Sequence, residues 1–141
     1  MRVDGMTPPA ILESALYVVD LAAAESFYTR ILGLPRIAGV EGRHVFFRCG
    51  QGVLLLFNAG ATIEPPPPGA SLPVPPHGAS GEGHLCFSAT ADEIARWKAL
   101  LEQKGVAIEA DFEWPAGGRS IYFRDPSGNS LEFAEPRIWG M

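Results

Sequence analysis

The chain has little that would suit a membrane, a nucleic acid or an oxidising compartment. No apolar run approaches the roughly 20 residues that a membrane span requires, and residues 1–5 lack the positive-then-apolar pattern of an export signal. Lysine and arginine number 11 among 141 residues, with a net charge of −5 and no basic run, which argues against a general nucleic-acid binder. The two cysteines, Cys49 and Cys86, sit in strand-like runs, which favours free buried thiols over a disulfide. We therefore expect a soluble cytoplasmic protein with no membrane or nucleic-acid partner.

What the chain does contain is one pattern that occurs twice, a strand followed by a helix and three more strands. The first copy predicts a strand over 11–19, a helix between its cap Asp20 and Gly33, and strands at 34–40, 44–49 and 53–58. The second predicts a strand over 83–89, a helix from a capping box at 90–93 to Gly105, and strands near 106–113, 120–124 and 130–135. A repeat of this kind predicts one α+β domain built from two modules, at about 11–59 and 83–136.

The segment between the modules differs in composition from both of them. Residues 59–83 hold seven of the thirteen prolines, including the runs 65–68 and 73–76. Proline has no backbone donor for a sheet interior, so this segment predicts an extended, semi-rigid connector, at about 60–82.

Superposing the modules brings ionisable groups to equivalent places. Glu13 and His84 then occupy equivalent positions on the first strands of the two modules. Because side chains alternate along a strand, each shares its face with the residue two positions further on. Glu132 lies among apolar residues of the last strand, where an unpaired carboxylate would be costly. Taken singly, such a Glu is usually solvated and such a His is satisfied by hydrogen bonds. Taken together, one His and two carboxylates form a reasonable site for Mn, Fe, Ni or Zn.

These residues match a known pattern. The chain from 11 to about 135 resembles the glyoxalase/bleomycin-resistance/extradiol-dioxygenase group, also called the vicinal oxygen chelate superfamily. The resemblance rests on the segments 11–21, 26–28, 32–34 and 83–85, and on the hairpin Asp125-Pro126-Ser127-Gly128-Asn129-Ser130-Leu131-Glu132. It implies two βαβββ modules with curled mixed sheets around a metal cleft, in a homodimer that shares or exchanges modules. It also implies metal ligands on the first and last strands, which correspond to Glu13, His84 and Glu132.

The sequence departs from the glyoxalase I pattern at the fourth ligand. The last strand of module one offers only Leu54, Leu55 or Leu56 at this position, and none of them binds a metal. A three-ligand site is closer to the extradiol dioxygenases and fosfomycin-resistance enzymes, although these usually carry His where this chain has Glu13.

Two functions follow from this reading. The first is a metal-dependent enzyme, either a glyoxalase-like lyase or isomerase or an extradiol-dioxygenase-like enzyme, in which a divalent cation chelates two oxygens of a small oxygenated substrate. Glu132 could then also serve as a general base and Tyr17 as an acid or substrate contact. The alternative is a metal-free protein of the bleomycin-resistance type that sequesters an antibiotic or toxin.

The remaining polar residues leave alternatives open. His44 lines the cleft or lies on the surface, and His77 is a surface or lid residue in the connector. The arginines that end strands either bind an anionic substrate group or are solvated charges: Arg48, Arg119 and Arg124.

Overall fold

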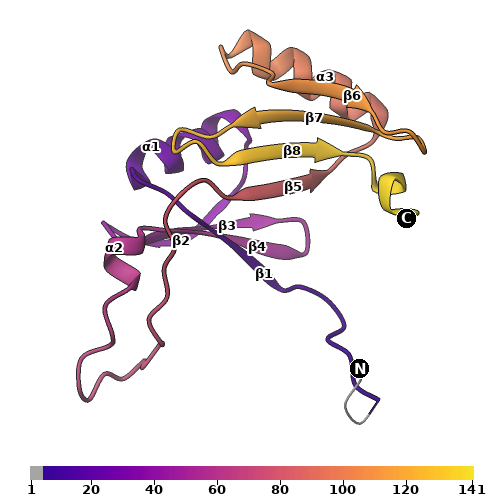
Figure 1. Ribbon diagram of the computed structural model, residues 1–141. Helices are drawn as coiled ribbons and strands as arrows, with labels where there is room; N and C mark the ends of the chain where they lie inside the picture. The colour runs from indigo at the N-terminus through magenta and orange to yellow at the C-terminus, as the bar shows by residue number, and fades with distance from the viewer. Residues whose placement is uncertain (1–4) are drawn as a thin grey trace.

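The computed structural model describes residues 5–141, which form two four-stranded mixed sheets with helices (Figure 1). Sheet one has the order β1-β4-β3-β2, with β1 Glu13–Tyr17, β2 Arg36–Val40, β3 His44–Cys49 and β4 Gly52–Phe57. Sheet two has the order β5-β8-β7-β6, with β5 His84–Ser88, β6 Ala110–Glu113, β7 Arg119–Arg124 and β8 Ser130–Ala134. The α+β class with two βαβββ modules is confirmed, and neither sheet closes into a barrel. Residues 1–4, used above in the argument about export, lie outside the described residues.

The internal repeat extends to the register of the strands. The first and last strands of each module run parallel, with Ala15 opposite Leu55 in sheet one and Cys86 opposite Glu132 in sheet two. Because Glu13 and His84 both begin their strands, Leu55 occupies the place in module one that Glu132 occupies in module two. The register therefore selects Leu55 from the three leucines left open by the sequence.

The helices begin where capping side chains satisfy free backbone N–H groups. The Asp20 carboxylate accepts from the Ala23 N–H at 3.0 Å and starts α1 Leu21–Ser26, which continues as a π-helical turn over Phe27–Ile31. The predicted capping box starts α3 Ala91–Gln103, and a 3₁₀ turn over Pro136–Trp139 follows the last strand. None of the helices in the described part of the chain is long and apolar enough to cross a membrane.

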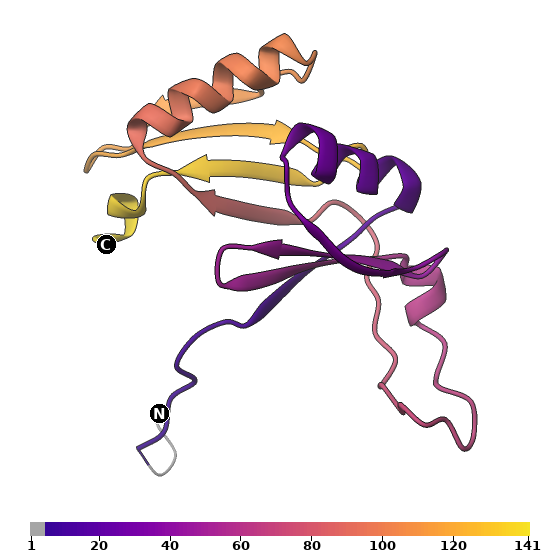
Figure 2. The same ribbon diagram turned by 180° about the vertical axis from the view of Figure 1, so that it is seen from behind.

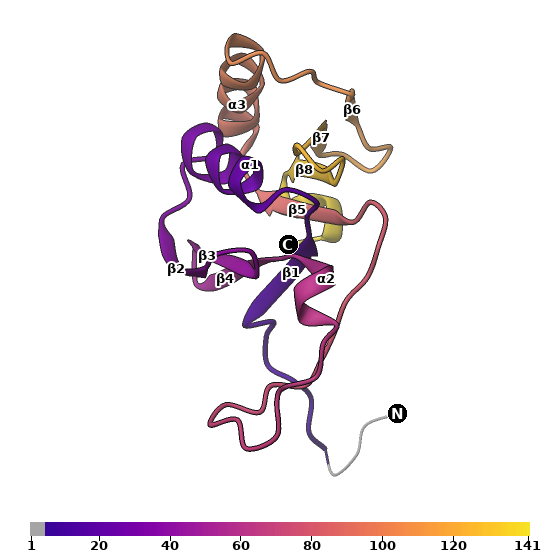
Figure 3. The ribbon, with the colours of Figure 1, turned by 90° about the vertical axis from the view of Figure 1, so that its left-hand side faces the viewer.

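The connector contains a turn that its composition did not predict. Asn58 caps α2 Ala59–Thr62 by accepting from the Gly60 N–H at 3.1 Å. This turn forms because it precedes the proline run, where backbone donors are still available. The rest of the connector leaves the body of the protein as a long loop beyond sheet one (Figures 1 and 3).

The apolar faces of both sheets belong to one core. Figure 2 shows α3 lying over sheet two, on the apolar face that carries Phe133, while α1 contacts β3 and β4 of sheet one. Phe27 of the π-turn packs against Phe123 of β7, with ring centroids 6.4 Å apart, and Trp97 of α3 stacks on Phe133 at 4.7 Å. The polar faces of both sheets consequently point out of this core.

The burial of Leu12 and of both cysteines departs from what their strands predict. Leu12 alternates onto the same strand face as the buried Leu16 but is 74% exposed, because it precedes the first paired residue of β1. The thiols are free, as expected, but neither cysteine is buried: Cys49 is partly accessible and Cys86 is exposed on the polar face of β5.

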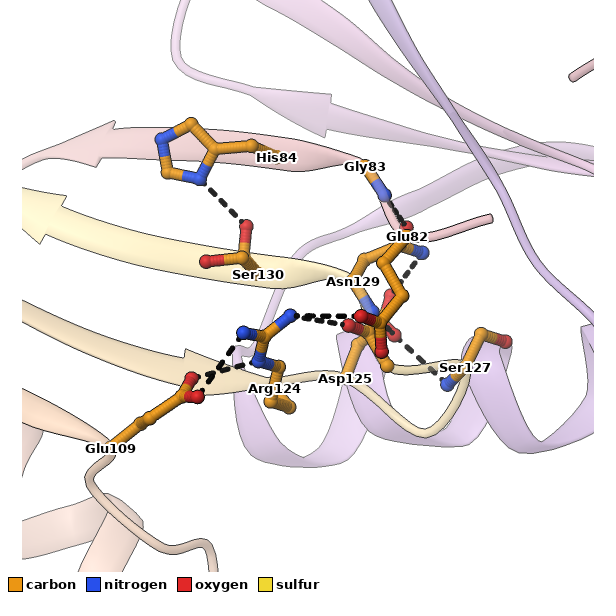
Figure 4. A network of polar contacts seen from close by, with 10 residues as sticks. Glu82, Gly83, His84, Glu109, Arg124, Asp125, Ser127, Asn129 and Ser130 are labelled. Atoms are coloured by element: carbon orange, nitrogen blue, oxygen red, sulfur yellow. Dashed lines mark hydrogen bonds and ion pairs between the residues drawn. The ribbon is translucent and has the colours of Figure 1, made fainter. Parts of the chain in front are cut away.

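The β7–β8 hairpin ties the modules together through its turn (Figure 4). The buried Asp125 carboxylate accepts from the Tyr28 hydroxyl at 2.8 Å, and burial together with this carboxylate raises the pKa of Tyr28 far above its usual range. The Asn129 amide donates to the Tyr17 carbonyl at 3.0 Å and accepts from the Gly83 N–H at 2.7 Å. Gly128 takes the positive φ of 86° that the tight turn requires. The hairpin thus fixes the start of β5 relative to the end of β1.

Candidate metal site

Two of the three predicted ligands lie together. His84 Nε2 of β5 is 3.2 Å from Glu132 Oε1 of β8, on the polar face of sheet two. The Glu132 side chain is 6% exposed and the His84 side chain 52% exposed. The carboxylate is therefore buried beside an imidazole that solvent can reach.

Glu13 does not join this pair within one chain. It begins β1 in sheet one, on the face that points away from the shared core. Within residues 5–141, no group of three His, Cys, Asp or Glu side chains is arranged to hold a metal ion. The single chain therefore provides a two-residue half-site and a separate carboxylate.

The hydrogen bonding of His84 defines what its other nitrogen offers. Nδ1 lies 3.0 Å from the Ser130 carbonyl oxygen, which can only accept, so Nδ1 carries the proton (Figure 4). In the neutral ring, Nε2 then presents a lone pair toward the Glu132 carboxylate. Two electron-rich atoms at this distance need a cation between them, either a proton or a metal ion. A carbonyl that holds the far nitrogen of a metal-binding His is the usual supporting arrangement.

A second set of hydrogen bonds fixes the Glu132 carboxylate. The fully buried Ser120 hydroxyl of β7 donates to Glu132 Oε2 at 2.6 Å and accepts from Trp114 Nε1 at 2.8 Å. Since Ser120 has one proton and gives it to Glu132, the direction of the chain from Trp114 to Glu132 is fixed. Oε2 is thereby engaged, and Oε1 remains free toward His84.

The neighbours of Glu132 respond to its charge. Burial, followed by the Glu132 carboxylate, raises the pKa of Tyr122 on β7 to about 12. The same two causes raise the pKa of the Cys86 thiol to about 12, although the residue as a whole is exposed. Both groups therefore stay protonated at neutral pH and remain potential hydrogen-bond donors toward the carboxylate.

Glu13 opens onto a cavity of about 1010 Å³ on sheet one. The strand register orders the residues of its floor in rows, from Glu13 beside Val53 at one end to Phe57 at the other. Ala15 and Leu55 form the middle row. The connector lines the opposite wall through the segments 64–67, 70, 72 and 74–77.

Tyr17 pairs with Phe57 at the end of β1 but does not itself line the cavity. It is four strand steps from Glu13, which is about 13 Å. Its hydroxyl contacts His77 Nδ1 of the connector at 2.7 Å. His77 and His44 both line the cavity. The structure thus decides the placement of the two histidines that the sequence left open.

Two of the three candidate anion-binding arginines already pair with carboxylates of the same chain. Arg119 forms a two-pronged contact with Asp111, both distances being 2.9 Å, and Arg124 contacts Glu109 at 2.7 and 3.1 Å (Figure 4). Arg48 is exposed and does not line the cavity.

Comparison with known proteins defines the family. A model of the Glyoxalase/Bleomycin resistance protein/Dioxygenase superfamily matches residues 10–133. The chain belongs to this superfamily. No curated protein matches the chain.

Solved structures of the superfamily resemble the chain over almost its whole length. A lactoylglutathione lyase from Agrobacterium tumefaciens is 42% identical, covering 96% of this chain and 100% of its own, with a TM-score of 0.91. A virulence protein from Salmonella typhimurium is 27% identical, covering 92% and 98%, with a TM-score of 0.67. A glyoxalase/bleomycin resistance protein/dioxygenase from Nocardioides, at 24% identity, 94% and 86% coverage and a TM-score of 0.71, shows the common fold.

Sequence reasoning did not identify the residues that support Glu132. Ser120 and Tyr122 alternate on one face of the predicted strand 120–124, and the short turn pairs that strand with the next. The register of a tight hairpin places Tyr122 opposite Glu132, as observed, so this contact was accessible in principle. The hydrogen bond from Trp114 to Ser120 could not be predicted from the sequence, because it depends on the bend between β6 and β7.

Proposed function

We propose that this superfamily member is a metal-dependent lyase of the glyoxalase type, acting on a small molecule with two neighbouring oxygens. Glu13, His84 and Glu132 would hold a divalent metal, with Glu13 coming from one subunit of a homodimer and the other two from its partner. The observation that supports this most is the pair of facing atoms His84 Nε2 and Glu132 Oε1, 3.2 Å apart, with the tautomer set by Ser130. The 42% identity to a lactoylglutathione lyase favours a lyase over a dioxygenase.

The need for a second subunit comes from the orientation of the sheets. The apolar faces of both sheets share one core, so the polar faces with Glu13 and with the His84–Glu132 pair point away from it. A two-fold symmetric dimer would bring sheet one of each chain to sheet two of the other and create two identical sites.

A bound divalent metal would supply Lewis-acid polarisation of the substrate oxygens. Glu132 and Glu13 suit different roles because their carboxylates are held to different degrees. Glu132 is fixed by Ser120 and suits a ligand. Glu13 makes no side-chain hydrogen bond or ion pair within residues 5–141, and it begins its strand beside the cavity. We assign to Glu13 the transfer of a proton between adjacent positions of the substrate, which requires a carboxylate free to move.

Mixing two inactive variants tests the shared site. Glu13→Gln and His84→Ala would each lose metal binding and activity as homodimers. In a mixed dimer of the two, one site has both substitutions and the other has neither. After unfolding and refolding an equal mixture, half of the dimers are mixed, so about a quarter of wild-type metal content and activity should return. Metal content is measured on gel-filtered protein by mass spectrometry.

The control mixture pairs His84→Ala with Glu132→Gln, which lie in the same half-site. Every dimer of this mixture, mixed or not, has a damaged half in both sites, so no activity should return. Recovery in neither mixture, with wild-type protein that binds metal, contradicts the shared site. Wild-type protein that takes up no divalent metal contradicts the metal-dependent lyase itself.

The second candidate is metal-free sequestration of a small molecule. It is favoured by Leu55, an aliphatic residue at the place equivalent to Glu132 in module one. A wild-type protein without metal that still binds a compound in the sheet-one cavity would support it.

A further inference from the structure

The cavity on sheet one has an aromatic end that the proposed metal chemistry does not use. Neutral His44 stacks on Phe46 with ring centroids 4.2 Å apart and planes at 8°. Phe57 stands edge-on to both rings, at 6.0 Å and 78° to His44 and at 5.7 Å and 77° to Phe46. His77 from the connector stands edge-on to Phe57 at 4.5 Å and 73°. These four rings, which we call the aromatic end, offer both faces and edges to a planar group.

One cationic side chain lies beside this end. Arg43 Nη1 donates to the Ala61 carbonyl at 3.2 Å, and both residues line the cavity. Among the described residues, no carboxylate lies within ion-pair distance of Arg43. Burial, and then the charge of Arg43, lowers the pKa of His44. His44 is therefore neutral, and Arg43 supplies the positive charge at this end of the cavity.

The acidic residues of the cavity lie elsewhere or in solvent. Glu13 pairs with Val53, about 13 Å along the strand from the row that holds Phe57 and His44. Glu64 is exposed on the connector. An anionic group beside Arg43 therefore meets a half-buried guanidinium with free N–H groups and no competing partner.

The connector holds the cavity in shape without a ligand. The His77 N–H donates to the Thr62 carbonyl at 3.0 Å, and its ring contacts the Tyr17 hydroxyl at 2.7 Å. Between these anchors and α2, the proline runs restrict the backbone. A site formed in advance loses less free energy on ordering when it binds.

We propose that this cavity binds an aromatic carboxylate, with its ring against the aromatic end and its carboxylate on Arg43. The inference rests on the proposed function in that the compound is the substrate class of the same cleft. Its binding step, however, uses only sheet one and the connector. The connector, read from the sequence as a linker, is then a wall of the binding site.

Equilibrium binding of 2-naphthoate to chelator-treated protein tests this, followed by the fluorescence of the naphthalene ring. Arg43→Gln removes the charge and should weaken binding at least about tenfold, as expected for a charge-assisted hydrogen bond. Phe46→Leu keeps an apolar side chain but removes the stacking ring, and should weaken binding about threefold to tenfold. Cyclohexanecarboxylate, which is not planar, should compete poorly.

Matched controls are Arg48→Gln, on β3, the strand just after Arg43, but outside the cavity, and Phe112→Leu, a partly exposed aromatic residue of β6. Both should bind 2-naphthoate like the wild type, and thermal melts of all four variants confirm that they are folded. Equal affinity of the Arg43 and Phe46 variants and their controls overturns the inference, as does no binding to folded wild-type protein. Binding that persists in His84→Ala, without metal, supports the inference even if the proposed lyase activity is absent.

Discussion

Ser120→Ala tests whether the buried hydrogen-bond chain positions Glu132. The substitution removes one oxygen from a fully buried site and leaves two atoms without their partner, Glu132 Oε2 and Trp114 Nε1. A hydrogen bond to a charged group contributes about 1.5–3 kcal/mol, and a buried group left without a partner costs a similar amount. Trp114 is 38% exposed, so water can replace part of its contact. We expect the free energy of unfolding to fall by about 2 kcal/mol.

The same variant should weaken metal binding, because the carboxylate is free to rotate away from His84. Loss of a group that orients a ligand typically costs about 10-fold to 100-fold in metal affinity. Urea unfolding of the metal-free protein measures the first effect, and competition with a chromophoric chelator measures the second.

Ser130→Ala is the matched control. It removes a hydroxyl from the same sheet, beside the same site, but keeps the backbone carbonyl to which His84 donates. This variant should retain the stability and metal affinity of the wild type. If the two serine variants behave alike in both assays, Ser120 does not position Glu132.

Two further predictions concern charges elsewhere on the sheets. Asp111 accepts from Arg119 and Lys98, and these hydrogen bonds hold its pKa well below its usual range. A depressed pKa stabilises the fold above the unfolded-state value of about 3.9 and loses this effect as the pH falls further. Asp111→Asn should therefore lower stability by about 1 kcal/mol at pH 7 in urea unfolding, with a penalty that shrinks below pH 4 or so; a penalty that is constant with pH would contradict this. Leu55→Glu places a carboxylate at the position equivalent to Glu132, so it should tighten metal binding about tenfold in the chelator competition and make stability more dependent on metal; unchanged affinity would show that Leu55 does not face the metal.

Much of the fold was predictable because its signals are local. Alternating apolar residues, the cap at Asp20 and the capping box at Thr90 fixed the type and order of the elements within a few residues. The proline content of 59–83 identified the connector, but not its role as a cavity wall, which depends on the contact between His77 and Tyr17.

The candidate site was predictable only in its components. The repeat paired Glu13 with His84 because equivalent strands carry them, and the pleat put Glu132 on the matching face of β8. This pattern did not show how the two sheets are oriented relative to each other. Both modules turn their apolar faces into one core, which separates Glu13 from the other two side chains within the chain.

The sequence by itself determined the superfamily, the two modules and the face on which each polar residue lies, since these depend on periodicity and turn chemistry within short segments. Only the tertiary structure decided which of these residues meet. It joined His84 to Glu132 and placed Ser120 and Trp114 behind them. It also folded the connector over the aromatic end of sheet one. Such contacts join residues far apart in the chain, and they depend on how two sheets and their helices pack around a shared core.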